Sequence, residues 1–149
     1  MTVHETIARA TTVREKVHFL SEGTSCAAWF YPGANGACVV MAPGLAVTKE
    51  VGADRLAARL QQAGFGVLAI DYRQLGESDG RPRQVAHFGR QRADLRAAIA
   101  HAPNAAVAAA RRAPRGEVVR LPGGHYAAFL EQHDATVRVL IDFLERQLR

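Results

Sequence analysis

A short apolar stretch between two turn signals most constrains what this chain can fold into. Residues 65–70 read FGVLAI, follow Gly64 and lead through Asp71 into a polar, glycine-punctuated loop. An unbroken apolar run of this length is typical of a strand that is buried on both faces, as in a parallel sheet. Functional groups gather in the loops at the carboxyl ends of such strands, so the loop after residue 70 is the first place to look for a site.

A second apolar run and a helical pattern precede this strand. Residues 37–42 read ACVVMA, which predicts a central strand. Apolar residues recur at helical spacing over 48–63, which predicts a helix that ends at Gly64. Residues 37–70 therefore form one βαβ unit, whose two strands should be parallel and joined by a right-handed crossover.

The flanking segments extend this unit into a single layered α/β domain over residues 1–149. Alternating patterns predict an N-terminal antiparallel hairpin, with strands at 13–20 and 25–31. Other patterns predict helices over 88–101, 105–112 and 133–148, and a strand over 117–121.

Composition and charge exclude several classes of protein. Hydrophobic residues make up 48% of the 149 residues, which indicates a globular domain. No apolar run reaches the roughly 20 residues that span a bilayer, and residues 1–17 lack the apolar core of a secretory signal, so we expect a cytoplasmic protein. The net charge is +5, but acids interleave the arginines, and we expect no nucleic-acid or membrane partner. The cysteines and histidines lack metal-ligand spacing, so we expect no metal and no other cofactor.

The loop after residue 70 contains a literal G-x-S-x-G pattern, from Gly76 to Gly80, with Ser78 as the candidate nucleophile. A true nucleophile elbow turns sharply from a strand directly into a helix. Here the strand ends eight residues before Ser78, and the next predicted helix begins only at Phe88. This spacing favours a turn in which Ser78 bonds to local backbone.

The order of these motifs resembles the α/β-hydrolase superfamily, in particular small esterases akin to dienelactone hydrolases and the X-Pro dipeptidyl-peptidase relatives. VVMAPGLAVTKE (39–50) is similar to that family's strand and oxyanion loop, and residues 55–83 to its next helix, strand and loop. Residues 113–129, with the last helix, resemble its final strand, catalytic-histidine loop and closing helix. The resemblance implies that the backbone N–H of Leu45 lies at the oxyanion-hole position and that His125 lies at the position of the general base.

The family's central segment has no counterpart here. The helix at 88–101 should lead into a strand, the nucleophile elbow and the triad acid, but Pro103 follows directly with an alanine-rich segment. The resemblance therefore implies a shortened α/β-hydrolase core, a three-layer sandwich with a mostly parallel sheet of about five strands and an antiparallel N-terminal hairpin. The order expected in this sheet is the two hairpin strands, then 65–70, then 37–42, with 117–121 pairing to 37–42. Asp71 and Asp134 are candidate surrogate acids, although a turn anchor and a helix cap are the expected roles.

Three functions stay open from the sequence. The first is a hydrolase-family protein for ester or peptide bonds that is catalytically incomplete on its own. The second is a weak serine esterase that uses Ser78 and His125 on a small ester or amide. The third is a non-catalytic binding or assembly module, or half of a split hydrolase. Lys49 and Glu50, beside the oxyanion loop, could touch a ligand, although a solvated helix start is expected there. If 117–121 leaves the strand at 37–42 uncovered, the open edge invites a homodimer.

Overall fold

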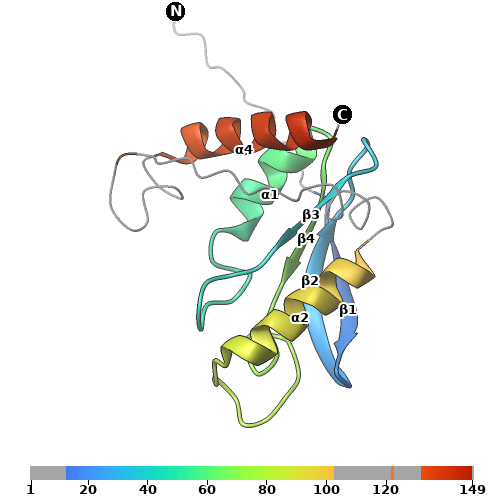
Figure 1. The fold of residues 1–149 in the computed structure, drawn as a ribbon, viewed down its shortest axis with the longest axis vertical. Coiled ribbons are helices and arrows are strands. Elements are labelled where there is room, and N and C mark those ends of the chain that lie inside the picture. Colours follow the sequence, from blue (N-terminus) through green and yellow to red (C-terminus); the bar gives the residue numbers. More distant parts are fainter. Residues whose placement is uncertain (1–12, 103–121, 123–131, 149) are drawn as a thin grey trace, which may run out of the picture.

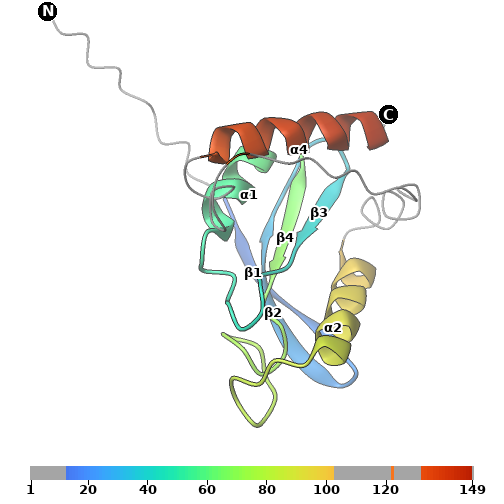
Figure 2. The same ribbon diagram turned by 60° about the vertical axis from the view of Figure 1, so that its left-hand side comes forward.

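A computed structural model describes residues 13–102, 122 and 132–148 as a four-stranded sheet with helices on both faces (Figure 1, Figure 2). The strands are β1 (Glu15–Ser21), β2 (Thr24–Tyr31), β3 (Cys38–Met41) and β4 (Gly66–Ile70). The helices are α1 (Ala53–Gln62), α2 (Phe88–His101) and α4 (His133–Leu148). Within these described residues, no helix is both long enough and apolar enough to cross a bilayer.

The strand order is β1-β2-β4-β3, which confirms the predicted order for these four strands. The βαβ unit is confirmed as well, because β3 and β4 pair in parallel from Cys38↔Gly66 to Met41↔Ala69. β2 pairs antiparallel with both β1 and β4. The described part of the sheet is therefore mixed rather than mostly parallel, since the hairpin contributes two antiparallel pairings. The predicted fifth strand, 117–121, and the predicted helix 105–112 lie outside the described residues.

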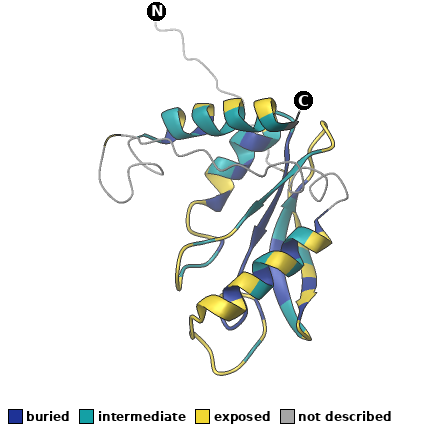
Figure 3. Ribbon diagram, in the orientation of Figure 1, coloured by how far each residue is buried: buried dark blue, intermediate teal, exposed yellow. Residues whose placement is uncertain are grey.

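β4 is the centre of the three layers. All five of its residues are buried (Figure 3). Leu68 and Ile70 pack on the face that α2 covers, and Val67 and Ala69 pack on the opposite face, against α1. Alternation along a strand places successive side chains on opposite faces, so an unbroken apolar run fits a strand covered on both sides. The α1 face also receives α4, through its residues Leu140, Ile141 and Leu144.

The helix boundaries differ from the predicted ones at one important place. α2 spans the predicted residues, and its N-terminus is capped by His87, whose Nδ1 accepts the backbone N–H of Arg90 at 3.3 Å. α1, in contrast, begins at Ala53, five residues after the predicted start at 48. Residues 48–52 form turns instead, ending at Gly52 with a φ of +80°. These turns carry a lysine of the candidate site.

Substitution of Leu68 by alanine tests the central role of β4. Leu68 is 1% exposed, so removing its side chain should lower the free energy of unfolding by about 2–5 kcal/mol. Leu20→Ala on β1 is the matched control, because Leu20 is 72% exposed and its truncation should cost less than about 0.5 kcal/mol. Urea unfolding measures both values, and equal losses in the two variants would contradict this description of the core.

Candidate functional site

The loop that follows β4, residues 71–80, is folded around the side chain of Asp71. This carboxylate is fully buried. Its Oδ1 accepts the backbone N–H of Lys49 at 2.8 Å, and its Oδ2 accepts the backbone N–H of Glu77 at 3.0 Å. Since Lys49 lies in the loop after β3, Asp71 joins the two loops at the carboxyl ends of the parallel strands, where an α/β sheet places its functional groups.

Lys49 places a positive charge in the middle of this junction. Its Nζ lies 2.6 Å from Asp71 Oδ2, 2.8 Å from Glu77 Oε2 and 2.9 Å from Glu50 Oε1. The lysine side chain is buried, so the expectation of a solvated helix start at this residue is wrong. Tertiary pairing overrides the local pattern here, because Asp71 and Glu77 come from a loop more than 20 residues away.

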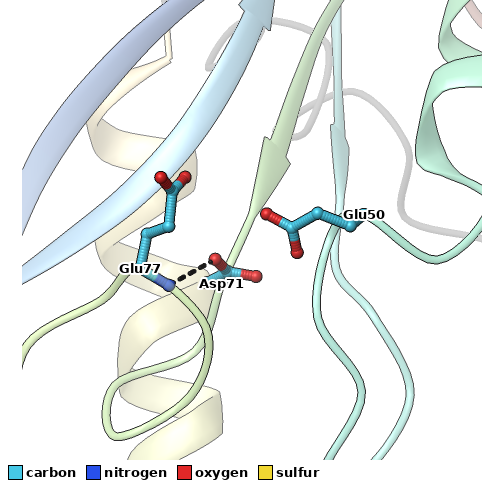
Figure 4. A group of neighbouring side chains, drawn as sticks. All are labelled: Glu50, Asp71 and Glu77. Atoms are coloured by element: carbon cyan, nitrogen blue, oxygen red, sulfur yellow. Dashed lines mark hydrogen bonds between the residues drawn. The ribbon is translucent and has the colours of Figure 1, made fainter.

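Three carboxylates converge at this point. Figure 4 shows Asp71 between Glu50 and Glu77, at the end of the strand that precedes it. One oxygen from each residue lies within 4.8 Å of the others, which is a spacing that a metal ion could use. The ammonium group of Lys49, however, is already within hydrogen-bond distance of all three. In the described part of the chain, the cation of this cluster is therefore supplied by the protein itself.

The charges of the cluster stabilise one another. Burial acts to lower the pKa of Lys49, but its hydrogen bonds to Asp71, Glu50 and Glu77 outweigh this, and the pKa lies above its ordinary value. Hydrogen bonds from Lys16 and Lys49 lower the pKa of Glu77 to about 2. The Nζ of Lys16 lies 2.5 Å from Oε1 of Glu77. The lysine is thus held charged, which suits an ion pair that holds the loops together.

Ser78 lies beneath this junction rather than on its surface. The residue is 1% exposed. Its Oγ donates a hydrogen bond to the backbone oxygen of Asp71 at 2.7 Å and accepts one from the backbone N–H of Ala27 at 2.8 Å. The next residue, Asp79, donates its N–H to the backbone oxygen of Ser25 at 2.8 Å. Ser78 therefore ties the loop to β2.

Both glycines of the G-x-S-x-G pattern are also explained by the shape of the loop. Gly76 has a φ of +50°, and a Cβ there would lie 2.3 Å from Oδ2 of Asp71. Gly80 has a φ of +112°, and a Cβ there would lie 2.9 Å from Cγ of Gln74. Glycine is the residue that adopts such φ values without strain and leaves room for a close neighbour. The pattern thus describes a tight loop around Asp71.

A second buried ion pair, which was not predicted from the sequence, holds this loop to α2. Arg73 donates its backbone N–H to Asp94 Oδ2 at 2.9 Å and its Nε to Asp94 Oδ1 at 2.7 Å. The same guanidinium reaches Ser21 Oγ at 2.8 Å, at the end of β1. Asp94 is the one acidic residue within α2 and lies in line with the apolar face of that helix. This position was the sequence feature that could have predicted a buried partner for Asp94.

Two of the remaining predicted residues, Leu45 and Asp134, take no part in this cluster. Leu45 is 55% exposed, in a turn after β3 in which the N–H of Val47 bonds to the oxygen of Gly44 at 3.2 Å. Asp134 is exposed and pairs with Arg59 at 2.8 Å. It lies within the first turn of α4 rather than at the predicted cap position. His125 lies outside the described residues. Ser78 therefore contacts Asp71, but its hydroxyl bonds to the backbone oxygen of Asp71. The carboxylate of Asp71 pairs with Lys49 instead.

Comparisons with known proteins place this architecture among hydrolases. The family described as serine aminopeptidase, S33, matches residues 33–115, which is more than half of the chain. The chain is 38% identical over 89 residues to the quorum-quenching protein AidA of Acinetobacter baumannii, covering 58% of this chain and 29% of that protein. It is 40% identical over 72 residues to the polyketide transferase af380 of Aspergillus fumigatus, covering 47% of this chain and 25% of that one. The chain thus spans less than a third of the length of these curated relatives.

Solved structures agree. The α/β-hydrolase GrgF from a Penicillium species superimposes with a TM-score of 0.58 and 27% identity, covering 60% of this chain and 32% of that one. Protein PA2218 of Pseudomonas aeruginosa superimposes with a TM-score of 0.57 and 30% identity, covering 62% of this chain and 30% of that one. The shared part accounts for about three fifths of this chain and for about a third of each of these two structures.

The lowered pKa of Glu77 predicts how this cluster responds to acid. The folded-state pKa of about 2 lies below the ordinary 4.5, so ionised Glu77 stabilises the fold above pH 4.5. That contribution should be lost as the pH falls from 4.5 toward 2. Glu77→Gln should therefore lower the free energy of unfolding at pH 7 and make little difference near pH 2.

Urea unfolding at both pH values measures this difference. Glu15→Gln, at an exposed glutamate on β1, is the control and should change the free energy of unfolding at pH 7 by less than about 0.5 kcal/mol. A Glu77→Gln effect of the same size at pH 7 and pH 2 would contradict the assigned ion pairs.

Proposed function

Because the chain belongs to the serine aminopeptidase S33 family of α/β-hydrolases, we propose that it is a hydrolase core domain that does not hydrolyse esters or peptides on its own. The observation that supports this proposal most strongly is the burial and hydrogen bonding of the Ser78 hydroxyl. A serine nucleophile needs an accessible hydroxyl with a general base within hydrogen-bond reach. The hydroxyl of Ser78 is buried and is bonded to two backbone groups.

The carboxylate of Asp71, a candidate triad acid in this loop, also has a structural role. A triad acid orients a histidine by accepting its ring N–H. Both carboxylate oxygens of Asp71 instead accept backbone N–H groups, and one of them also binds the ammonium group of Lys49. To act in catalysis, Asp71 would have to give up the bonds that hold two loops in place. This supports a scaffolding role for residues 71–80.

The turn at Leu45 is the part of the site that supports a relation to hydrolases in function as well as in fold. It follows β3 at the carboxyl end of the strand, exposed to solvent, where the resemblance puts one donor of an oxyanion hole. One such donor without a second N–H and a nucleophile stabilises little. We therefore propose that Leu45 contributes to catalysis only in a form that also carries a nucleophile elbow.

We propose an ester or an amide as the substrate class of any form that carries the elbow, supported by the family match. The named activities of the relatives, quorum quenching and polyketide transfer, differ from each other and point to no narrower substrate. We propose a reducing compartment such as the cytoplasm, supported by the free thiols of Cys26 and Cys38.

A serine-reactive probe tests the proposal directly. The purified chain should not be labelled by a fluorophosphonate and should not hydrolyse a short-chain aryl ester above the buffer rate. A complete serine esterase of the same superfamily serves as the positive control. Labelling of Ser78, identified by mass spectrometry and abolished in Ser78→Ala, would overturn the proposal in favour of a weak esterase.

The same substitution has a structural readout. Ser78→Ala leaves the buried N–H of Ala27 without its acceptor, so the free energy of unfolding should fall by about 1–3 kcal/mol. Ser25→Ala is the matched control, because Ser25 contributes its backbone oxygen to the loop and the substitution keeps that group. An unchanged stability in Ser78→Ala would contradict the structural role given to this serine.

A further inference from the structure

The outward side of α2 and the loop before it form a strongly basic surface. Residues 81–101 contain five arginines and one acid. The acid, Asp94, is fully buried and pairs with Arg73, so it does not offset the arginines outside. Figure 3 shows exposed residues along α2 and through this loop. The exposed arginines are Arg81, Arg83, Arg90, Arg92 and Arg96. Acids interleaved with the arginines were the reason to expect no membrane partner, and none lies on the exposed surface of residues 81–101.

Four of these five arginines are available to an external anion. Arg83 is the exception, because its guanidinium donates to the backbone oxygen of Gly76 at 2.6 Å and to that of Ser78. The other four form no ion pair within the described part of the chain. A guanidinium presents a planar set of donors that matches the oxygens of a phosphate. The surface therefore offers several phosphate-binding groups that the protein itself does not use.

Two exposed apolar side chains accompany the arginines. Phe88, the first residue of α2, is 76% exposed, and Val85, three residues earlier, is 39% exposed. Phe88, Arg92 and Arg96 follow one another at intervals of four residues, so they form one row along the outside of the helix. This row combines an aromatic side chain with two unpaired guanidinium groups.

We propose that this surface binds the phosphate headgroups of an anionic lipid bilayer, with Phe88 and Val85 entering the headgroup layer. Basic residues beside exposed apolar ones are typical of segments that lie in a membrane interface. The cytoplasmic leaflet carries anionic lipids, which agrees with the compartment proposed above. The binding is independent of whether the domain hydrolyses anything.

Two other anionic partners fit the surface less well. A nucleic acid would use the arginines and could stack a base on Phe88, but the aliphatic side chain of Val85 offers no stacking face. An acidic peptide is ordinarily recognised in a groove or along a sheet edge, whereas a residue as exposed as Phe88 suits insertion into a bilayer. A bilayer uses both the charged and the apolar side chains.

Flotation of the full chain with vesicles of defined lipid tests the proposal. The chain should float with vesicles made of equal parts of phosphatidylglycerol and phosphatidylcholine, and should not float with phosphatidylcholine alone. Salt at about 1 M shortens the screening length to about 3 Å, so it should release the bound chain. A chain that does not bind the phosphatidylglycerol vesicles at low salt, or that binds both kinds of vesicle equally, would overturn the proposal.

A paired set of variants locates the binding surface. Arg92→Ala combined with Arg96→Ala should weaken vesicle binding about thirtyfold, at about fivefold for each arginine near an anionic surface. Arg55→Ala combined with Arg138→Ala is the matched control, because these arginines are exposed on α1 and α4, on the opposite face of the sheet. The control pair should leave the binding nearly unchanged. Equal weakening by both pairs would show attraction by net charge alone and would overturn the proposal.

Phe88→Ala separates a bilayer from the other anionic partners. Loss of the apolar side chain should weaken vesicle binding about tenfold, because less apolar surface leaves water. Anisotropy of a labelled oligodeoxythymidylate and of a labelled oligoglutamate peptide, at the same salt concentration, measures the alternatives. Unchanged vesicle binding in Phe88→Ala would overturn the proposal. Tighter binding of the oligonucleotide or the peptide than of the vesicles would overturn it in favour of that partner.

Discussion

The buried pair between Asp71 and Lys49 is the interaction on which this end of the molecule depends. It connects the loop after β3 to the loop after β4, at the carboxyl ends of two parallel strands. Taking two charges out of water is costly, and the cost is offset only where further hydrogen bonds satisfy both groups. Here the carboxylate receives two backbone N–H groups, and the ammonium contacts three carboxylates.

The shape of the loop that contains the G-x-S-x-G pattern, residues 71–80, follows from this ion pair. Gly76 has no side chain because the carboxylate of Asp71 occupies that space. Ser78 is turned inward because its hydroxyl bridges the backbone of Asp71 and β2. Arg73 then fixes the same loop to α2 through Asp94. Hydrogen bonds thus fix this loop to β2 and α2 at the strand ends, and the hydroxyl of its one serine is buried among them.

The sequence predicted the architecture well and the site less well, for one physical reason. The βαβ unit and the limits of α2 follow from hydrophobic periodicity and turn residues, which act locally, whereas the strand order was implied by the family resemblance. The burial of Lys49 does not, because a lysine beside a glutamate in a polar segment is ordinarily solvated. Only a partner more than 20 residues away makes it a core residue. The sequence feature that could have predicted such a partner is the charged residue directly after a buried strand, Asp71.

A double-mutant cycle on Lys49 and Asp71 tests this account most directly. Lys49→Met should lower the free energy of unfolding by about 3–5 kcal/mol, because it leaves the buried carboxylate of Asp71 without a cation. Asp71→Asn should lower it by less, because the ammonium group of Lys49 keeps Glu77 and Glu50 as partners at 2.8 and 2.9 Å. The double variant should lose less than the sum, with a coupling of about 0.5–3 kcal/mol measured by urea unfolding. Two small and additive losses would show that the loops stand without the pair, and would contradict the structural explanation of the G-x-S-x-G loop.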